Sequence, residues 1–383
     1  MILHIIEILL FIPVAFSVLY IFIFAIASLL PETKHRKQDE KKHRFVVVFP
    51  AYAEDKVILD SVQSFLKQDY PKNLFQTIVV SDHMKPETNT QLQQYPITTL
   101  IANYSPSSKA KALQLAINSI HEEYDFIVIL DADNHVNPDF LSQLNTYCHA
   151  DTIALQAHRQ AKNQNTPVAL LDAISEEINN TIFRKAHNQI GMSSALIGSG
   201  MCFSYVWFCD HVMQLSTTGE DKELEEALLL EGHHIAFLDQ LPVLDEKVQS
   251  GQNFGNQRKR WIAAQLHSLI SLGKLIPTAL RNKRFNLIDK FIQQTLIPRS
   301  MLLCLVTFMT ILVSICCWTY GIKWCIVLSM LYASMLLSIP GKFYSKKLLY
   351  AIMQIPLLVF KMVMNLLHLK GASKNFIHTQ HGE

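Results

Sequence analysis

The chain has 383 residues, of which 50% are hydrophobic and only 17% charged, and its 34 Lys and Arg nearly balance 32 Asp and Glu. Because an ordinary soluble chain carries about 25% charged residues, much of this chain is predicted to lie away from water. The formal charge of +2 argues against a strongly basic nucleic-acid binder, and the apolar content excludes disorder. Seven Cys without Cys-x-x-Cys spacing argue against a disulfide framework or a zinc module.

The first expected element is a transmembrane helix over residues 8–30. This run has no charge and is long enough to cross a bilayer core of about 30 Å. A secretory signal peptide would begin with basic residues, and none precedes this run. Six cations follow it: Lys34, Arg36, Lys37, Lys41, Lys42 and Arg44. By the positive-inside rule they place the N-terminus outside and the following chain in the cytoplasm.

The segment from residue 44 to residue 298 alternates short β-rich runs with amphipathic stretches. This alternation is typical of βαβ units around a mostly parallel sheet. It predicts one α/β domain of about 250 residues. The expected strands are 45–49, 77–80, 97–101, 126–130 and 152–156, and the expected helices are 55–66 and 109–120.

Two acidic pairs are candidates for chemistry. Asp131 and Asp133 follow the buried strand 126–130, at the sheet edge where ligands usually bind. Oxygen ligands of this kind suit Mg²⁺ or Mn²⁺, although short acidic pairs also form turns and helix caps. Glu220 and Asp221 begin an amphipathic stretch that runs to Glu231. They could simply favour the helix dipole, or one could act as a general base.

A basic and aromatic segment follows near the end of this domain. Gln257, Arg258, Lys259, Arg260 and Trp261 place three cations beside an indole. One reading is a membrane-interface helix, expected from about residue 252. The other is a site in which arginines bind a diphosphate and Trp261 stacks beneath a sugar.

The C-terminal region contains further apolar runs. Residues 301–320 and 322–339 predict a tight transmembrane hairpin with both ends in the cytoplasm, because cations flank it on both sides. In residues 348–369, Pro356 and Lys361 interrupt the run. Two interpretations therefore stay open, a helix in the membrane interface and a fourth membrane crossing. The alternative for all these runs is core helices of a soluble protein.

Seven short motifs occur in an order that resembles the membrane-bound family 2 glycosyltransferases, the group with cellulose, chitin and hyaluronan synthases. The resemblance implies a GT-A nucleotide-sugar-binding domain with a mostly parallel mixed sheet and flanking helices. The motifs are VVVFPAYAED (46–55), IVVSDH (78–83), SKAKALQLAI (108–117), ILDADN (129–134), IGSGMCFS (197–204), TGED (218–221) and QRKRW (257–261). The chain departs from the family at Ala53, where Asn is common, and at Ser108, where Gly is frequent.

The resemblance also implies roles for individual residues. Asp221 deprotonates the acceptor, with Glu220 beside it, and the attack from the opposite face inverts the anomeric carbon. Asp131 and Asp133 hold Mg²⁺ or Mn²⁺, which aids departure of the nucleoside diphosphate. The nucleotide side comprises Pro50, Ala51, Tyr52, Glu54, Asp82, Lys109, Asp131, Gln257, Arg258, Arg260 and Trp261. Gly198, Ser199 and Gly200 border the donor sugar, and Trp261 also frames the acceptor.

The sequence thus predicts a membrane-bound inverting glycosyltransferase that uses a nucleotide sugar, expected to be a UDP-sugar, at the cytoplasmic membrane face. The acceptor is a polysaccharide or a lipid-linked molecule. A single-transfer enzyme resembling ceramide glucosyltransferases and a non-catalytic membrane scaffold are the alternatives. Expected partners are membrane lipids, the acceptor and other subunits of a synthesis complex, without nucleic acid. The expected regions are a membrane helix (1–33), a cytoplasmic domain (34–297) and a C-terminal membrane region (298–383).

Overall fold

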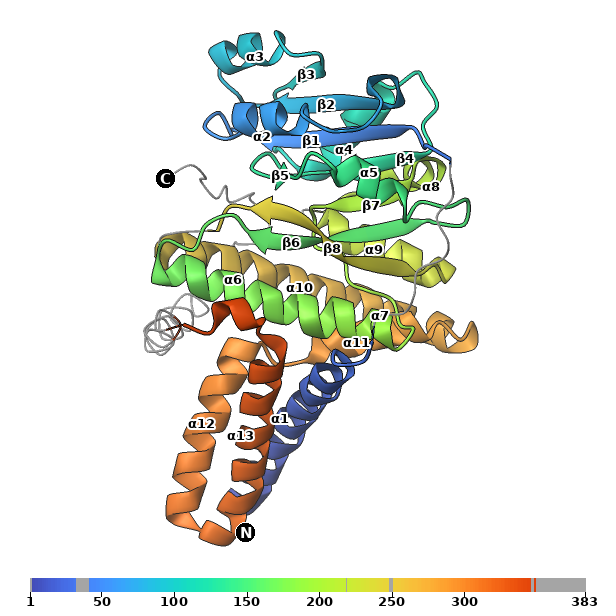
Figure 1. The fold of residues 1–383 in the computed structure, drawn as a ribbon. Helices are drawn as coiled ribbons and strands as arrows, with labels where there is room; N and C mark the ends of the chain where they lie inside the picture. The colour runs from blue at the N-terminus through green and yellow to red at the C-terminus, as the bar shows by residue number, and fades with distance from the viewer. Residues whose placement is uncertain (1, 32–40, 218, 248–250, 346–347, 349–383) are drawn as a thin grey trace.

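The computed structural model describes residues 2–31, 41–217, 219–247, 251–345 and 348. An α/β unit lies at one end and a bundle of three long helices at the other (Figure 1). Helices α6, α10 and α11 lie between these two parts. The predicted α/β class is confirmed.

The α/β unit is built on one mixed sheet with strand order β3-β2-β1-β4-β7-β6-β8-β5. Strands β3, β2, β1 and β4 are parallel, whereas β7 runs antiparallel to both β4 and β6. The strands are β1 Phe45–Tyr52, β2 Phe75–Asp82, β3 Thr98–Ala102, β4 Phe126–Ile129, β5 His135–Val136, β6 Ala154–Ala161, β7 Met201–Ser204 and β8 Ile235–Asp245. The register pairs Tyr52 with Asp82 and Asp82 with Ala102, so the ends of three strands meet at one edge.

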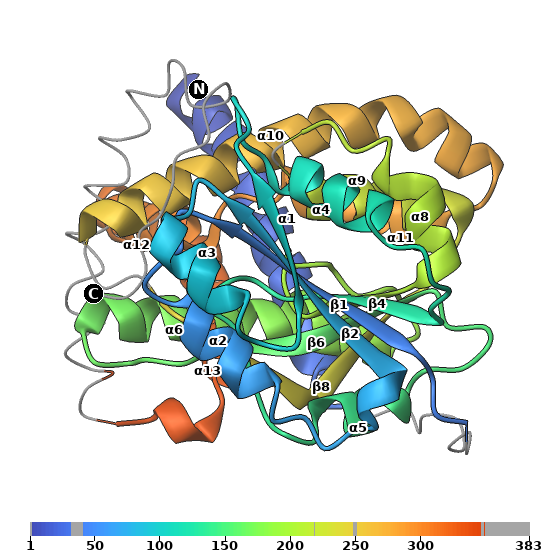
Figure 2. The same ribbon diagram turned by 90° about the horizontal axis from the view of Figure 1, so that it is seen from above.

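Two apolar clusters cover the two faces of this sheet because successive side chains of a strand point to opposite sides. Val46 and Val48 belong to the cluster under α4, α8 and α9, and Val47 and Phe49 to the cluster under α2 and α5. Figure 2 shows these helices on opposite sides of the sheet. The helices are α2 Ile58–Phe65, α3 Pro86–Leu92, α4 Lys109–Asn118, α5 Phe140–Asn145, α8 Tyr205–Val212 and α9 Glu220–Glu231, with 3-10 turns η1 Lys72–Leu74 and η3 Gly341–Phe343.

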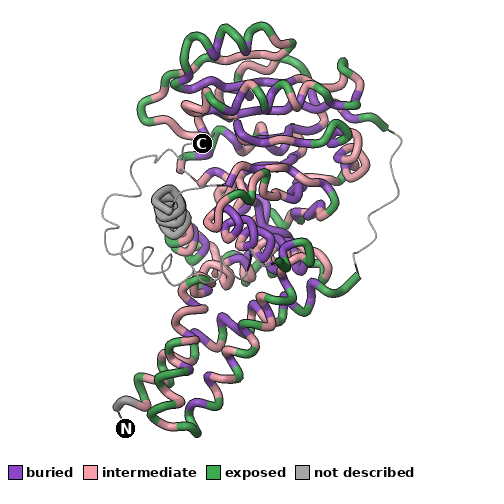
Figure 3. The backbone as a smooth tube through the Cα atoms, turned by 60° about the vertical axis from the view of Figure 1, so that its left-hand side comes forward, coloured by how far each residue is buried: buried purple, intermediate pink, exposed green. Residues whose placement is uncertain are grey.

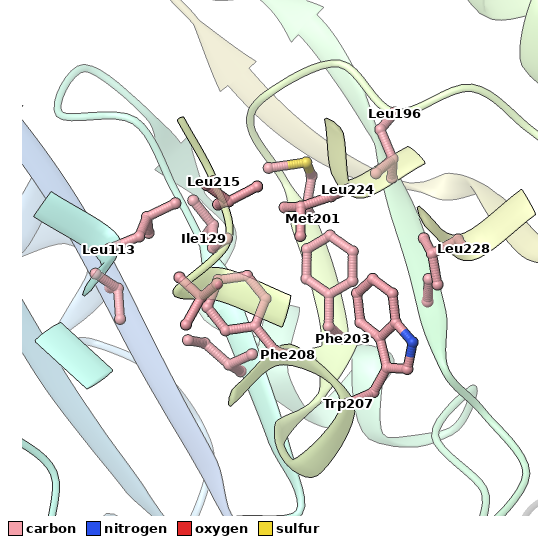
Figure 4. Close-up of a cluster of buried hydrophobic side chains, with 14 of the residues drawn as sticks. Leu113, Ile129, Leu196, Met201, Phe203, Trp207, Phe208, Leu215, Leu224 and Leu228 are labelled. Carbon is pink, nitrogen blue, oxygen red and sulfur yellow. The ribbon is translucent and has the colours of Figure 1, made fainter. Parts of the chain in front are cut away.

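The cluster on the α9 side fixes the helix that carries the second acidic pair. Leu224 and Leu228 of α9 are fully buried and lie in the same cluster as Phe203 of β7 and Phe208 of α8 (Figure 4). Burial of each such side chain stabilises the fold by about 1.5–3 kcal/mol. The start of α9 is therefore held by packing against the central strands.

A long helical segment lies under the sheet, on the side of the three-helix bundle. It comprises α6 Pro167–Asn180, a π-helical stretch η2 Thr181–Lys185 and α7 Ala186–Gln189. Thr166 caps its start, where the side chain accepts a hydrogen bond from the Ala169 amide at 3.1 Å. Its buried acid Glu176 pairs with Arg159 of β6 at 2.8 Å. A continuous helix thus joins the sheet to the bundle.

Within the described part of the chain, three helices are long and apolar enough to cross a membrane, judged by length and composition. They are α1 Ile2–Ala27, α12 Arg299–Cys316 and α13 Trp318–Ser338, and α13 packs against both others. Exposed residues recur along the outer faces of the bundle (Figure 3), and many of them are large and apolar, such as Ile5, Leu9 and Ile311.

The bundle differs from the sequence prediction at two places. Helix α1 includes Glu7, whose carboxylate lies 2.8 Å from Lys323 Nζ and accepts a hydrogen bond from Trp324 Nε1 at 2.6 Å. The hairpin turns at Cys317 instead of Gly321, which lies inside α13. A Cβ on Gly321 would lie 2.8 Å from Ser314 Cα, so this glycine allows α12 and α13 to pack closely.

Helix α10 Gly251–Arg281 begins close to the predicted position, and α11 Phe285–Thr295 follows it. Both adjoin the three-helix bundle (Figure 1). Ile270 and Phe285 are 64% and 70% exposed, so these helices present apolar side chains outward. The predicted fourth apolar segment, residues 348–369, lies almost wholly outside the described residues.

Candidate active site

Lys109 brings together four of the sequence motifs at the carboxyl edge of the sheet. It is the first residue of α4, and Ser108 caps that helix by accepting a hydrogen bond from the Lys111 amide. Lys109 Nζ donates to Asp131 Oδ1 at 2.5 Å and to the Gly198 carbonyl at 2.6 Å, and lies 3.5 Å from Glu220 Oε1. Burial alone would lower the pKa of Lys109, but Asp131 and Glu220 raise it above its ordinary value.

The segment after β4 forms a hydrogen-bonded turn that holds two carboxylates. The Asp131 amide donates to Asn134 Oδ1 at 2.9 Å, and the Asn134 amide returns a bond to the Asp131 carbonyl. Asp133 is 4% exposed and accepts a hydrogen bond from the Glu246 amide at 2.9 Å. The Asp131 side chain is 32% exposed. The turn thus presents one accessible acid and fixes the other against the end of β8.

These two carboxylates suit a divalent metal that is completed by a substrate. Among the described residues, no group of three or more His, Cys, Asp or Glu could hold a metal ion by itself. Mg²⁺ is usually bound through one or two carboxylates together with substrate phosphates and water. The donor set at Asp131 and Asp133 matches this requirement, and a diphosphate would supply the remaining oxygen ligands.

The glycine loop before β7 needs its glycines for two different reasons. Gly198 and Gly200 have φ angles of +86° and +65°, which L side chains rarely adopt. A Cβ on Gly200 would also lie 3.1 Å from Val243 Cγ2 and 3.3 Å from Ala157 Cβ. Ser199 between them is fully buried, and its hydroxyl donates to Asn134 Oδ1. The loop is thus fastened to the turn that carries Asp131.

The second acidic pair lies at the first turn of α9. Glu220 is 6% exposed, and burial raises its pKa from 4.5 to about 7 despite the opposing effect of Lys109. Asp221 is less buried, with 18% of its side chain exposed, and its Oδ2 lies 3.5 Å from Lys222 Nζ. The helix N-terminus favours negative charge at both positions. Of the two acids, Asp221 is the more accessible.

The predicted nucleotide residues meet where β1 and β2 end. The Ala53 amide donates to the Asp82 carbonyl at 3.0 Å, and Asp82 Oδ1 accepts a hydrogen bond from the Tyr104 amide at 3.1 Å. The rings of Tyr52 and His83 are 5.4 Å apart. Ala53 has a φ of +53°, a conformation that Asn tolerates better than Ala.

Three further features lie near the ends of β1 and β2. The Glu54 amide donates to Met84 Sδ at 3.0 Å. Ala51 is only 2% exposed and lies in an apolar cluster, so its side chain faces the core. A groove of about 580 Å³ opens beside His83 and Met84 and is lined further by Pro86, Asn89, Thr90, Gln93, Ile101, Ala102 and Asn103.

The predicted residues Gln257, Arg258, Arg260 and Trp261 lie in α10. Their side chains fall outside the described residues, so their contacts with the site stay a prediction.

Three buried or partly buried cations near the site were not predicted from the sequence. Arg159 Nη1 lies 3.5 Å from the Ile197 carbonyl, Arg184 Nε donates to the Ala195 carbonyl at 3.2 Å, and Lys222 Nζ donates to the Leu196 carbonyl at 3.0 Å. Arg159 and Arg184 belong to no motif, and only the tertiary fold brings them to the loop. For Lys222, the sequence feature that could have indicated a role is its position directly after Glu220 and Asp221.

Two individual proteins are similar to this chain, one in sequence and one in fold. The poly(ribitol-phosphate) beta-N-acetylglucosaminyltransferase TarS of Staphylococcus aureus is 22% identical over 144 residues, 35% of this chain and 24% of that protein. The match thus spans about a quarter of that relative's length. The mannosyltransferase PcManGT of Pyrobaculum calidifontis, solved with GDP-Man and Mn²⁺, shares the fold, with a TM-score of 0.55 and 13% identity over 84% of this chain and 93% of that one.

A family model gives the assignment for the α/β unit. The model described as "Glycosyltransferase like family 2" matches residues 43–264, which is more than half of the chain and includes all seven motifs. The described strands and helices of this range form the GT-A-like fold that the sequence predicted. The chain therefore belongs to glycosyltransferase family 2.

Proposed function

We propose that this protein is a membrane-bound inverting glycosyltransferase that moves a sugar from a nucleotide sugar, expected to be a UDP-sugar, to a polysaccharide or lipid-linked acceptor at the cytoplasmic membrane face. The observation that carries the proposal is the position of Lys109, which contacts Asp131, the Gly198 carbonyl and Glu220 at once. The predicted metal ligand, sugar loop and base region therefore share one centre. The GDP-Man bound to PcManGT supports a nucleotide-sugar donor, and the name of TarS supports transfer of a sugar.

In this proposal the nucleotide lies along the ends of β1 and β2, beside Tyr52 and Asp82. Its diphosphate then extends toward Asp131 and Asp133, which would hold Mg²⁺ or Mn²⁺. When bound, such an ion supplies Lewis-acid stabilisation of the departing nucleoside diphosphate. Lys109 provides a further cation for the phosphates, because its ammonium lies 2.5 Å from Asp131.

The proton transfer is assigned to Asp221. A general base must reach the hydroxyl from which it takes the proton, and Asp221 is more exposed than Glu220. The deprotonated acceptor attacks the anomeric carbon on the face opposite the diphosphate, which inverts its configuration. Glu220 remains buried beside Lys109, with its Oε1 3.5 Å from the ammonium.

The packing of α9 supports an acceptor at the membrane. Glu225 of α9 pairs with Lys290 of α11 at 2.6 Å, and Glu226 accepts hydrogen bonds from Ser268 and Ser271 of α10. The helix that carries Asp221 in its first turn therefore rests on two helices that adjoin the apolar bundle. We assign residues 1–33 and 298–383 to the membrane and residues 34–297 to the cytoplasm.

The first experiment is a donor panel. Detergent-purified protein with its lipids is incubated with nucleotide sugars and Mg²⁺ or Mn²⁺, and release of nucleoside diphosphate is measured. We expect release with one donor, which then serves as the labelled sugar for finding the acceptor. Labelled polymer identifies a polymerase, whereas a label soluble in organic solvent identifies single transfer to a lipid. Nucleotide binding without release from any donor points to a missing acceptor or subunit, and no binding at all favours the non-catalytic scaffold.

A further inference from the structure

The loop before β7 is held by cations from four different elements. Its four successive carbonyls, at residues 195–198, each lie within 3.5 Å of a different cationic side chain. The contacts are Arg184 of η2 to Ala195, Lys222 of α9 to Leu196, Arg159 of β6 to Ile197 and Lys109 of α4 to Gly198. Hydrogen bonds from charged donors are about twice as strong as neutral ones. The position of the loop thus depends on these side chains.

Lys222 differs from the other three cations because it also contacts the proposed base. Its Nζ lies 3.0 Å from the Leu196 carbonyl, 3.2 Å from Glu225 Oε2 and 3.5 Å from Asp221 Oδ2. An ammonium group has three donors, and three acceptors surround this one. The Lys222 side chain therefore links the loop before β7 to Asp221.

We propose that Lys222 is a positioning residue, which fixes the carboxylate of Asp221 relative to the loop that borders the donor sugar. The inference rests on the proposed function, because it requires Asp221 to act as the base. Catalysis by a positioned base is sensitive to small displacements, and a shift of about 1 Å can cost about 100-fold in rate. Loss of Lys222 removes the contacts to the Leu196 carbonyl and to Asp221. We therefore expect a lower rate of sugar transfer with little change in nucleotide affinity.

The alternative role for Lys222 is to neutralise the buried carboxylate of Glu225, and the chain offers a matched control for it. Lys290 of α11 pairs with the other oxygen of the same carboxylate at 2.6 Å. Lys290 is the more buried of the two lysines, with 6% of its side chain exposed against 28% for Lys222. Lys290 contacts Glu225 and Gln293, and these contacts involve neither the loop nor Asp221. If neutralising Glu225 were all that mattered, Lys290→Met would be at least as harmful as Lys222→Met.

The test compares Lys222→Met, Lys290→Met and Lys222→Arg in the full-length protein. The readouts are thermal unfolding, Kd for UDP with Mn²⁺, and kcat and KM with the nucleotide sugar found active. We expect both Met variants to unfold at lower temperature, with the larger decrease in Lys290→Met. Only Lys222→Met loses kcat, by about 10-fold or more, while its Kd for UDP stays within about twofold of wild type. Lys222→Arg recovers part of the kcat.

Three outcomes overturn the inference. One is unchanged kcat in folded Lys222→Met, and another is an equal loss of kcat in folded Lys290→Met and Lys222→Met. The third applies if Lys222→Met does not fold: Lys222→Arg keeps the charge beside Glu225, but its planar guanidinium has a different donor geometry. Wild-type kcat in that variant then shows that placement of the donor does not matter.

Failure of the proposed function is recognised separately. Normal turnover in Asp221→Asn removes Asp221 as the base, whatever Lys222 does. An inactive Asp221→Asn together with unchanged kcat in Lys222→Met removes only the positioning role.

Discussion

The ammonium of Lys109 lies 3.5 Å from the carboxylate of Glu220, between the start of α4 and the start of α9. The same ammonium contacts Asp131 at 2.5 Å. One cation therefore neutralises an acid from each of the two pairs that the sequence singled out. A change of charge at either acidic pair is expected to alter the electrostatic environment of the other pair, because both contact Lys109.

Substitution of the two α9 acids separates their roles. We expect Asp221→Asn to abolish sugar transfer and keep UDP binding, because it removes the base but no group assigned to the diphosphate. Glu220→Gln should retain measurable transfer, since Asp221 is unchanged. The measurement is product formation alongside UDP titration for both variants. If Glu220→Gln is inactive and Asp221→Asn is active, the base is Glu220.

Substitution of Asp133 tests the predicted metal site. We expect Asp133→Asn to weaken UDP binding about 10-fold or more in Mn²⁺, because the amide is a much weaker metal ligand than a carboxylate. The amide oxygen can still accept the hydrogen bond that the Glu246 amide now gives to Asp133, so unfolding should change little. Asp133→Ala, which loses both functions, is the structural comparison. Calorimetric titration with Mn²⁺ and with EDTA gives the result, and an unchanged Mn²⁺ dependence in Asp133→Asn means that the metal is held elsewhere.

Gly198 and Gly200, both in the loop before β7, should differ in how much stability they lose on substitution by alanine. Gly198→Ala meets only Lys109 Nζ, at 4.0 Å, so it costs about 1–2 kcal/mol for the left-handed backbone. Gly200→Ala adds crowding against Val243 and Ala157, at about 1–3 kcal/mol more. Denaturant unfolding of both variants in the same detergent measures the difference. Equal stability of the two variants contradicts the packing described around Gly200.

The raised pKa of Glu220 predicts a stability that falls as the pH rises. The native carboxyl titrates near 7 and the unfolded one near 4.5, so between these values the native state binds more protons. The contribution of this group is complete below 4.5 and is lost as the pH passes 7, a change on the order of 3 kcal/mol. Glu220→Gln should lack this slope. The comparison is thermal unfolding of both proteins across this range in EDTA, and parallel pH profiles argue against a buried, protonated Glu220.

The sequence predicted the part of the site that is built from local signals. The strand 126–130 followed by Asp131 and Asp133 located the acidic turn, because a buried strand and the residues after it occupy fixed places in a parallel sheet. The helix expected at 109–120 put Lys109 at its first turn, as observed. The strand Met201–Ser204 was not predicted, since it follows two glycines and has only four residues.

The remainder of the site depends on contacts between residues far apart in the chain. Arg159 and Arg184 have no periodicity or motif that relates them to the loop at 195–197. The sequence predicts a membrane helix from residue 8, after Glu7, because the run 8–30 carries no charge and a charge is costly in a bilayer. The partner of Glu7, Lys323, lies at the other end of the sequence, so no local pattern could indicate that the pair exists.

The ion pair between Glu7 and Lys323 can form only late in biosynthesis. In the proposed membrane arrangement, α1 leaves the ribosome first, and Glu7 has only His4 of the same helix beside it, at 3.7 Å, until Lys323 and Trp324 of α13 have been translated. The whole α/β domain is synthesised between these two helices. The catalytic domain therefore begins to fold beside a single, incompletely satisfied membrane helix, and the bundle is completed only after the last of its helices has been inserted.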